Sequence, residues 1–230
     1  IIGEKEFFGR PFFVGAGVLI PRPDSEILVT RSLELLQTIS PRRDDPIHIH
    51  DCCTGSGCIG LSIALEFIEL RSAPLILTLS DVDDTALAWA RRNVDRLVHS
   101  SQLTVNLHRF DLFAVDAAPD GAAGSGLPAA DLITANPPYL TTEETVDVLN
   151  RGWSEPSIAL DAGKTGVEAL DRLVPQAFSH LRPGGYLIVE HGATQAERLA
   201  QRMDRAGFQS VAGRVALAGR NRCTEGRTPE

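Results

Sequence analysis

The sequence ADLITANPPYL (130–140) ends an apolar run with an amide side chain, two prolines and an aromatic ring. Pro137 and Pro138 remove two backbone donors and fix φ near about −65°, so a strand cannot continue through them. The side-chain oxygen of Asn136 and the carbonyl oxygen of Pro137 can then accept hydrogen bonds from a planar NH₂ group, against which Tyr139 can pack. This corner therefore indicates chemistry on an amide or amino nitrogen; the alternative is an ordinary loop with a Pro–Pro turn.

Three acids, Asp51, Asp81 and Asp111, follow three successive predicted strands. The carboxyl ends of parallel strands meet at one edge of a sheet, where ligands bind. After the first of these strands, Gly55 and Gly57 let the backbone turn sharply and approach a ligand closely. An acid in the position of Asp81 accepts hydrogen bonds from ribose hydroxyls in doubly wound folds, and Asp111 is placed to accept from the exocyclic amine of an adenine. Each acid alone is more often a helix cap or turn residue, but together they indicate a nucleoside site.

This predicted site is not suited to phosphate. The sequence has no GxxxxGK[ST] loop and no clean GxGxxG fingerprint, and the three carboxylates would repel a phosphate group. S-adenosylmethionine fits better, because it combines ribose hydroxyls, an adenine and a sulfonium cation without phosphate. The residues predicted to bind this cofactor are Asp51, Cys53, Thr54, Gly55, Ser56, Gly57, Asp81, Val82, Asp111, Leu112 and Asn136.

The elements that must position these residues alternate along the chain. Strands are expected at 47–53, 75–81, 103–110, 130–136 and 186–191, with helices at 58–70, 83–98, 166–181 and 194–206. Residues 208–218 resemble a further strand and are followed by a short tail, and residues 114–129 read as a surface loop. Before this alternation, residues 1–40 predict a small hairpin with Gly9 in its turn and a helix capped by Asp24 or Ser25. The pattern predicts an α/β fold with a doubly wound, mostly parallel sheet.

Composition narrows the class of protein. The chain has 230 residues, of which 43% are hydrophobic, as expected for one large α/β domain or one domain with a small appendage. The net charge of −8 and the short basic runs disfavour a nucleic-acid substrate. The four cysteines lack the spacing of a metal site, so we expect free thiols in a reducing compartment and no metal. No apolar run approaches the roughly 20 residues that span a bilayer, and no secretory signal is visible.

The order of the glycine turn, Asp81 and NPPY resembles that of class I S-adenosylmethionine-dependent methyltransferases. LIPRPDSE (19–26), FFGRPFFV (7–14) and EHG (190–192) are similar to the HemK/PrmC family, the peptide chain release factor glutamine N5-methyltransferases. Sister enzymes that act on a ribosomal protein usually differ where PRPDSE stands here. The resemblance covers essentially the whole chain.

The resemblance implies a seven-stranded sheet, transfer of a methyl group to the glutamine of a GGQ motif, and S-adenosylhomocysteine as the product. It also implies a cytoplasmic, monomeric enzyme with no membrane association. Residues 1–40 would join a missing N-terminal helical domain to a catalytic domain at 41–230. Asn136, Pro137, Pro138 and Tyr139 would be the catalytic, substrate-binding corner, and Arg22 and Phe12 would also contact the substrate.

Several assignments have alternatives. Phe7, Phe12 and Phe13 could cover the cofactor or substrate channel, or pack beneath the hairpin. Arg22 could instead pair with the carboxylate of the cofactor or form a structural pair with Glu26. The family usually has glycine where Cys53 stands, and binding is expected to survive if the φ angle of this cysteine is negative.

Two other roles are open at this stage, and His191 is expected to be structural. The same NPPY corner serves N6-adenine methyltransferases, which act on a flipped base. A non-enzymatic domain that binds the cofactor and acts as an assembly partner is the second possibility.

Overall fold

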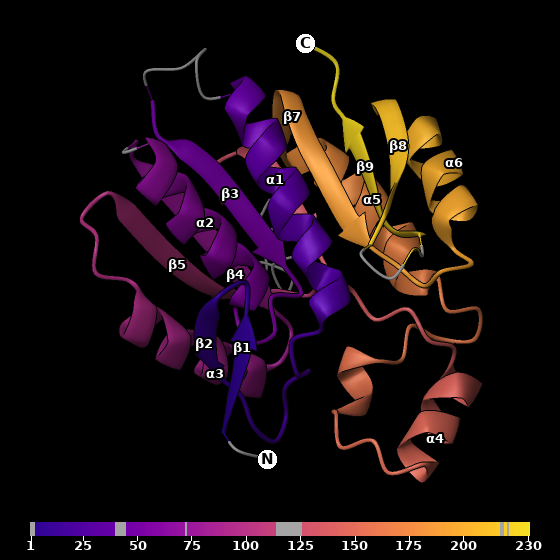
Figure 1. The fold of residues 1–230 in the computed structure, drawn as a ribbon. Helices are drawn as coiled ribbons and strands as arrows, with labels where there is room; N and C mark the ends of the chain where they lie inside the picture. Colours follow the sequence, from indigo (N-terminus) through magenta and orange to yellow (C-terminus); the bar gives the residue numbers. More distant parts are fainter. Residues whose placement is uncertain (1–2, 40–44, 72, 114–125, 217–218, 220) are drawn as a thin grey trace.

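A computed structural model describes residues 3–39, 45–71, 73–113, 126–216, 219 and 221–230 (Figure 1). Its main sheet has the order β5-β4-β3-β6-β7-β9-β8. These strands are β3 (Ile47–Cys52), β4 (Leu75–Asp81), β5 (Leu103–Arg109), β6 (Ala130–Ala135), β7 (Leu181–Glu190), β8 (Gln209–Val215) and β9 (Asn221–Arg227). Neighbours from β5 to β7 pair in parallel, whereas β9 is antiparallel to both β7 and β8. The predicted seven-stranded, mostly parallel sheet is confirmed.

Helices cover both faces of this sheet. One hydrophobic cluster joins the strands to α1 (Glu26–Ile39), α2 (Cys58–Arg71) and α3 (Asp84–Leu97), and a second joins them to α5 (Glu168–His180) and α6 (Ala196–Ala206). Figure 1 shows α1 and α2 in front of the sheet and α5 behind it, with α4 (Thr142–Asn150) standing beyond the carboxyl edge. The two helical layers leave the carboxyl edge of the sheet open. The predicted chemical groups lie at this edge, at the ends of the parallel strands.

The N-terminal hairpin forms as predicted from β1 (Glu4–Phe7) and β2 (Arg10–Phe13). Phe8 and Gly9 both have positive φ, 49° and 71°, as a tight two-residue turn requires. Phe7 and Phe12 are buried in the core cluster of α1 and α2, with their rings edge to face. The hairpin is therefore packed onto the same core as the sheet.

Two predictions about the C-terminal third were wrong. The expected tail is strand β9, inserted between β7 and β8. Its buried residues are Cys223, Thr224, Glu225 and Gly226, so it lacks an apolar alternation; Glu225 is tolerated there because Arg31 and Arg214 pair with it. β7 also begins at Leu181 rather than at the predicted position 186, and a register shift opposite Ala130–Leu132 accommodates its glycines.

Other boundaries agree within a few residues. The helix predicted to be capped by Asp24 or Ser25 begins at Glu26, directly after a single 3₁₀ turn, η1 (Pro23–Ser25). Most of the predicted surface loop at 114–129 lies outside the described residues.

Candidate active site

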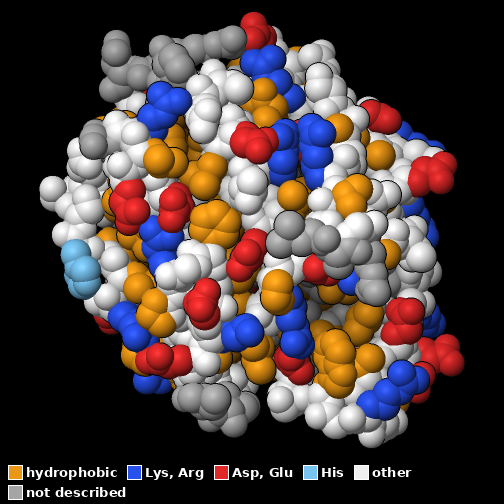
Figure 2. Space-filling model, viewed as in Figure 1, with side chains coloured by type: hydrophobic (Ala, Val, Ile, Leu, Met, Phe, Trp, Pro, Cys, Tyr) orange, Lys and Arg blue, Asp and Glu red, His pale blue; other side chains and the backbone are white. Residues whose placement is uncertain are grey.

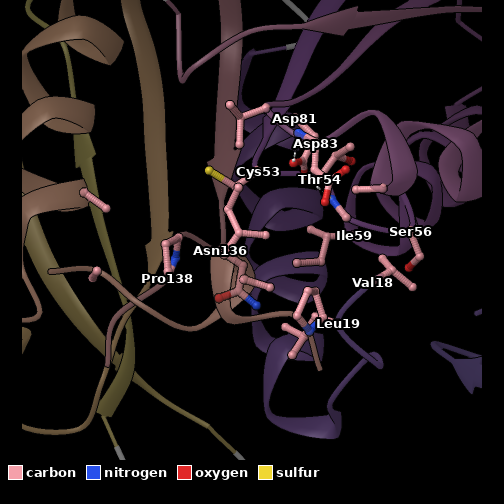
Figure 3. A pocket seen from close by; sticks show the side chains of 18 of the residues that line it. Val18, Leu19, Cys53, Thr54, Ser56, Ile59, Asp81, Asp83, Asn136 and Pro138 are labelled. Atoms are coloured by element: carbon pink, nitrogen blue, oxygen red, sulfur yellow. Dashed lines mark hydrogen bonds between the residues drawn. The ribbon is translucent and has the colours of Figure 1, made fainter. Parts of the chain in front are cut away.

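A cavity of about 410 Å³ opens at the carboxyl edge of the sheet (Figure 3). Of the predicted site residues, it is lined by Arg22, Cys53, Thr54, Gly55, Ser56, Asp81, Val82, Asp111, Leu112, Asn136 and Pro138. Asp51, Gly57, Pro137, Tyr139 and Phe12 were also predicted for the site but are not among the lining residues. The strand ends thus bring together segments that lie more than a hundred residues apart in the sequence.

Asp51 organises the turn after β3 from below the cavity. Its side chain is 1% exposed and accepts hydrogen bonds from the Thr54 hydroxyl (2.6 Å), the Gly60 amide (3.1 Å) and the Thr134 hydroxyl (2.7 Å). Burial raises its pKa to about 6, although these three bonds act in the opposite direction. Gly60 is needed at this contact, because an added Cβ would lie 2.8 Å from the Asp51 Cβ. The carboxylate therefore holds β3, α2 and β6 in register rather than facing a ligand.

Asp81, at the end of β4, holds the glycine turn (residues 53–57) from its other side. Its carboxylate accepts from the Gly55 amide at 2.9 Å and the Asp83 amide at 3.1 Å. Burial is the main cause of its raised pKa. Each carboxylate oxygen has a second acceptor site, so Asp81, which lines the cavity, can still accept from a ligand hydroxyl.

Cys53 has a positive φ of 56°, so the expectation of a negative φ is wrong. The turn needs a left-handed residue here, which is why glycine suits this position and why cysteine is strained. The thiol lines the cavity beside Thr54 and lies 4.0 Å from the Cys52 sulfur (Figure 3). Its pKa is raised well above the ordinary value, first by the contact with Cys52 and then by burial, which disfavours the thiolate form.

Asn93 is a buried contact to the same turn that the sequence reasoning missed. This α3 residue donates through its side-chain amide to the Ser56 carbonyl (2.9 Å) and the Phe13 carbonyl (3.0 Å), and accepts from the Phe13 amide (2.7 Å). It thereby ties the hairpin to the glycine turn. A single asparagine within a charged amphipathic helix gives no sequence signal for this role.

The far end of the cavity is apolar with an ion pair beside it. Val82, Phe110 and Leu112 line it, and the Phe110 amide donates to the Asp81 carbonyl at 3.0 Å. Asp111 lies at the same end but forms an ion pair with Arg172, a second lining residue that was not predicted. A flat aromatic group suits this end.

The NPPY corner forms the opposite wall. The side-chain oxygen of Asn136 is buried and has no hydrogen-bond partner among the described residues, and its side chain lines the cavity beside Pro138 (Figure 3). After the corner, Leu140 exchanges backbone hydrogen bonds with Leu160 and Ala162 at 3.0 and 2.8 Å. An unsatisfied acceptor in a cavity costs free energy unless a ligand donates to it.

The N-terminal residues divide between the cavity and the core. Arg22 lines the cavity and pairs with Glu155 rather than with Glu26, while its guanidinium lies 5.2 Å from the Trp153 ring. Phe12 is 0% exposed in the core cluster, so the prediction that it contacts a substrate is wrong. An aromatic beneath a hairpin and one that covers a channel give the same sequence signal. Phe13 lies under Arg96 at 4.3 Å, outside the lining residues.

Two polar residues at the end of β7 are buried. His191 donates from Nδ1 to the Gly192 carbonyl and accepts at Nε2 from the Thr224 hydroxyl, both at 2.9 Å, which makes it structural, as expected. Burial raises the pKa of Glu190 to about 7, and its Oε2 has no hydrogen-bond partner among the described residues. The charge of Glu190 also contributes to the raised pKa of Tyr139, for which burial is the larger cause.

The lining residues suit a cationic nucleoside. Five of them are acids and two are arginines; the acids are Asp81, Asp83, Asp111, Asp161 and Glu168. Gly55 and Gly57 have left-handed φ angles of 55° and 81°, and Gly55 brings the backbone against the cavity. Among the described residues, no group of acids, histidines and cysteines is arranged to hold a metal ion, and no described helix has the length and apolar character to cross a bilayer.

Known proteins share this sequence and fold. A release factor glutamine methyltransferase of Shewanella oneidensis is 34% identical over 99% of this chain and 71% of its own length. One from Koribacter versatilis is also 34% identical, over 100% of this chain and 74% of its own length. No protein-family model matches the chain.

Two solved structures show the fold alone. A methyltransferase from Pyrococcus furiosus superposes with a TM-score of 0.59 at 18% identity, covering 97% of this chain and 91% of its own. The N-terminal domain of human METTL16, solved with S-adenosylhomocysteine, gives a TM-score of 0.62 at 17% identity, covering 96% and 76%.

The strand order, the cavity at the carboxyl edge and these likenesses define a class I methyltransferase fold. Within that class, the sequence identity to relatives settles the family. The chain belongs to the release factor glutamine methyltransferase family.

Proposed function

We propose that this protein transfers a methyl group from S-adenosylmethionine to the side-chain amide nitrogen of a glutamine in peptide chain release factors. The observation that carries the proposal is the side-chain oxygen of Asn136, buried in the cavity without a partner among the described residues. A glutamine NH₂ group supplies the donor that this oxygen needs. The relatives named for this activity support the choice of acceptor.

The described residues fit the cofactor. Asp81 would accept from the ribose hydroxyls, and the lining residues Val82, Phe110 and Leu112 would border the adenine. The glycine turn, through Gly55, brings the backbone against the ligand without a side chain between them. Asp51 acts indirectly, by holding the turn. S-adenosylmethionine supplies an electrophilic methyl group on a sulfonium cation, which the acidic lining favours electrostatically.

The NPPY corner would hold and orient the glutamine amide nitrogen, which is a weak nucleophile. The lone pair of a glutamine amide nitrogen is delocalised into its carbonyl, so the nitrogen reacts only when it is held and oriented. Asn136 and the Pro137 carbonyl accept its two hydrogens and turn the lone pair toward the electrophile, and Tyr139 packs on the amide plane. Holding the reacting atoms within about 3–3.5 Å supplies most of the rate enhancement. No general base is needed, since the methylated nitrogen is cationic and loses its proton readily.

The finer parts of the proposal follow the family. The target is the glutamine of a GGQ motif, and S-adenosylhomocysteine is the product. We propose a cytoplasmic monomer without membrane association; the four free cysteines are consistent with a reducing compartment. Residues 41–230 carry the catalysis, and residues 1–40 connect them to a preceding helical domain.

Nucleic acid is the disfavoured acceptor. The net charge is −8, and Figure 2 shows acidic and basic side chains interspersed over the face in view. A duplex backbone is bound by clustered Lys and Arg. The adenine alternative is therefore kept only as an outcome of the test.

The test is methyl incorporation from labelled S-adenosylmethionine into purified release factor, with DNA and RNA in parallel reactions. The enzymes are the natural sequence, Asn136→Ala and the control Asn106→Ala, whose side chain is exposed on β5. We expect a single methylated glutamine by mass spectrometry, a loss of about 10³-fold in kcat for Asn136→Ala, and unchanged cofactor binding. Methylation of adenine alone would overturn the release-factor assignment, and cofactor binding without transfer to any acceptor would favour the non-enzymatic alternative.

A further inference from the structure

The two prolines deprive the NPPY corner of backbone hydrogen-bond donors that could fix its position. Pro137 and Pro138 have no N–H, so neither can donate a hydrogen bond that would fix the corner to its surroundings. Among the described residues, the corner is held next to its reacting end through the carbonyl oxygen of Tyr139, which accepts from the side chain of Gln195 at 3.0 Å. This contact joins residues 56 positions apart in the sequence.

Gln195 makes three hydrogen bonds with one side chain. Its amide nitrogen also donates to the Gly166 carbonyl at 2.8 Å, and its amide oxygen accepts from the Gly192 backbone at 2.9 Å. Its main chain begins α6, since the Leu199 amide donates to its carbonyl at 2.9 Å. One amide therefore connects the corner, the loop before α5 and the loop after β7.

The surroundings of Gln195 are shaped to admit this amide. A Cβ on Gly166 would lie 3.0 Å from the Tyr139 carbonyl oxygen and 3.2 Å from the Gln195 amide nitrogen. A Cβ on Gly192 would lie 3.1 Å from the Gln195 amide oxygen. Two glycines thus keep clear the space in which a glutamine, with one donor and one acceptor end, fits in a single orientation.

We propose that Gln195 is a positioning residue for the methyl-transfer reaction, and that it fixes Tyr139 and hence the acceptor carbonyl of Pro137 and the side chain of Asn136. The inference rests on the proposed function. It assigns no contact between Gln195 and the substrate or cofactor, because Gln195 is not among the residues that line the cavity.

The sharpest variant is Gln195→Glu. It keeps the size of the side chain and its bond from Gly192, but it directs a carboxylate oxygen at the two carbonyl oxygens of Tyr139 and Gly166. Gln195→Ala removes the contacts without adding charge. Gln209→Glu, an exposed position on β8, is the control for the added charge.

The experiment measures kcat, the KM for release factor and the Kd for S-adenosylhomocysteine, at a temperature well below every melting midpoint. We expect Gln195→Glu to lower kcat by about 100-fold, the effect of a displacement of about 1 Å in the reacting groups. Gln195→Ala should lower it less, while the Kd stays within about twofold of the natural protein in both.

An unchanged kcat in folded Gln195→Glu would overturn the inference. So would a Kd that weakens in parallel with kcat, because the residue would then support the whole fold and not the corner. If Gln195→Glu does not fold, Gln195→Ala decides by the same two criteria. Failure of the proposed function is distinguishable, because the natural protein itself would then leave release factor unmethylated.

Discussion

The two walls of the cavity are built in different ways. The cofactor wall, formed by the ends of β3 and β4 and the glycine turn, combines short and long contacts: Asp51 reaches Thr54 three residues away and Gly60 nine residues away, while its bond to Thr134 spans 83 residues. The acceptor wall, formed by the NPPY corner and residues 153–162, is held by distant partners. Tyr139 is fixed by Gln195, 56 residues away, and Arg22 pairs with Glu155 across 133 residues.

This difference has an energetic counterpart in two buried carboxylates. Asp51, on the cofactor wall, accepts three hydrogen bonds. Glu190, which lies close enough to raise the pKa of Tyr139, has one oxygen without a partner among the described residues. The Asp51 carboxylate is thus satisfied before any ligand arrives, whereas the Asn136 side-chain oxygen on the acceptor wall and one oxygen of the nearby Glu190 are not; on the cofactor wall, the buried Ser56 hydroxyl also lacks a partner among the described residues.

The largest effect should come from Gly60→Ala, which breaks the cofactor wall. The added Cβ would lie 2.7 Å from Leu79 Cδ2 and 2.8 Å from the Asp51 Cβ. We expect a loss of about 3 kcal/mol in the free energy of unfolding, as for overpacking of a tight core, together with weaker cofactor binding. Urea denaturation and calorimetric titration with S-adenosylhomocysteine measure the two effects.

Gly213→Ala is the matched control. A Cβ there meets nothing within 4 Å, and its φ is not left-handed. Stability should change by less than about 0.5 kcal/mol. Equal effects of the two substitutions would mean that the contact between α2 and β3 is not tightly packed.

The pH dependence of the stability of Glu190→Gln, compared with that of the natural protein, tests whether Glu190 is a buried carboxyl with a raised pKa. Burial raises the pKa of Glu190 in the folded protein from 4.5 to about 7, so the folded state binds a proton that the unfolded state releases between these values. The charged form therefore costs stability above pH 7, and the natural protein should recover that stability as the pH falls from about 7 to 4.5. Relative to the natural protein, the variant should be more stable at pH 8 by roughly 3 kcal/mol, and this advantage should vanish by pH 4.5.

The difference between the two proteins isolates Glu190 from other groups. Asp51, whose pKa is raised to about 6, and His50, whose pKa burial lowers to about 3, titrate equally in both. Denaturation curves at several pH values give the difference directly. A stability difference that does not vary with pH would show that Glu190 is not titrating as a buried acid.

The contrast between the walls also explains what the sequence could predict. The cofactor wall could be predicted because its glycines and acids stand at or directly after the ends of apolar strands. Gln195 and Glu155 could not be assigned, since a polar residue in a loop gives no signal of a partner fifty or more positions away. β9 was missed for a related reason: its buried Thr224 and Glu225 are compatible with the core only because other segments supply their partners.

Some information was present in the sequence and was misinterpreted. Glycine is usual in the family at the position of Cys53, and that preference indicates a left-handed backbone angle. The angle is indeed positive, 56°. Phe12 was assigned to a substrate channel because an aromatic beside a hairpin gives no indication of which face it occupies, whereas packing against Phe7 places it in the core.

A smaller effect is expected from Arg22→Ala, which opens the acceptor wall. Its partner Glu155 is 7% exposed, so the substitution leaves a buried carboxylate without its cation and removes the stacking on Trp153. Because the Arg22 side chain is 41% exposed, solvent screens the pair and we expect a loss of only about 1–2 kcal/mol.

The exposed pair of Arg151 and Asp147, 4.0 Å apart, offers the control: Arg151→Ala should cost less than about 0.5 kcal/mol. Thermal unfolding of both variants decides, and equal costs would mean that Glu155 is effectively solvated.

The smallest effect is expected at Cys53, and it should be a gain. A left-handed non-glycine residue costs about 1–2 kcal/mol, while glycine costs about 0.5–1 kcal/mol more than other residues in lost backbone freedom. Cys53→Gly should therefore stabilise the protein by roughly 0.5–1 kcal/mol and leave cofactor affinity unchanged. Cys53→Ala separates backbone strain from the loss of the thiol, because alanine keeps the Cβ and with it the strain. If both variants unfold at the same denaturant concentration, backbone strain at position 53 is not the cause of the stability change. The cofactor wall then tolerates a left-handed angle in a residue other than glycine.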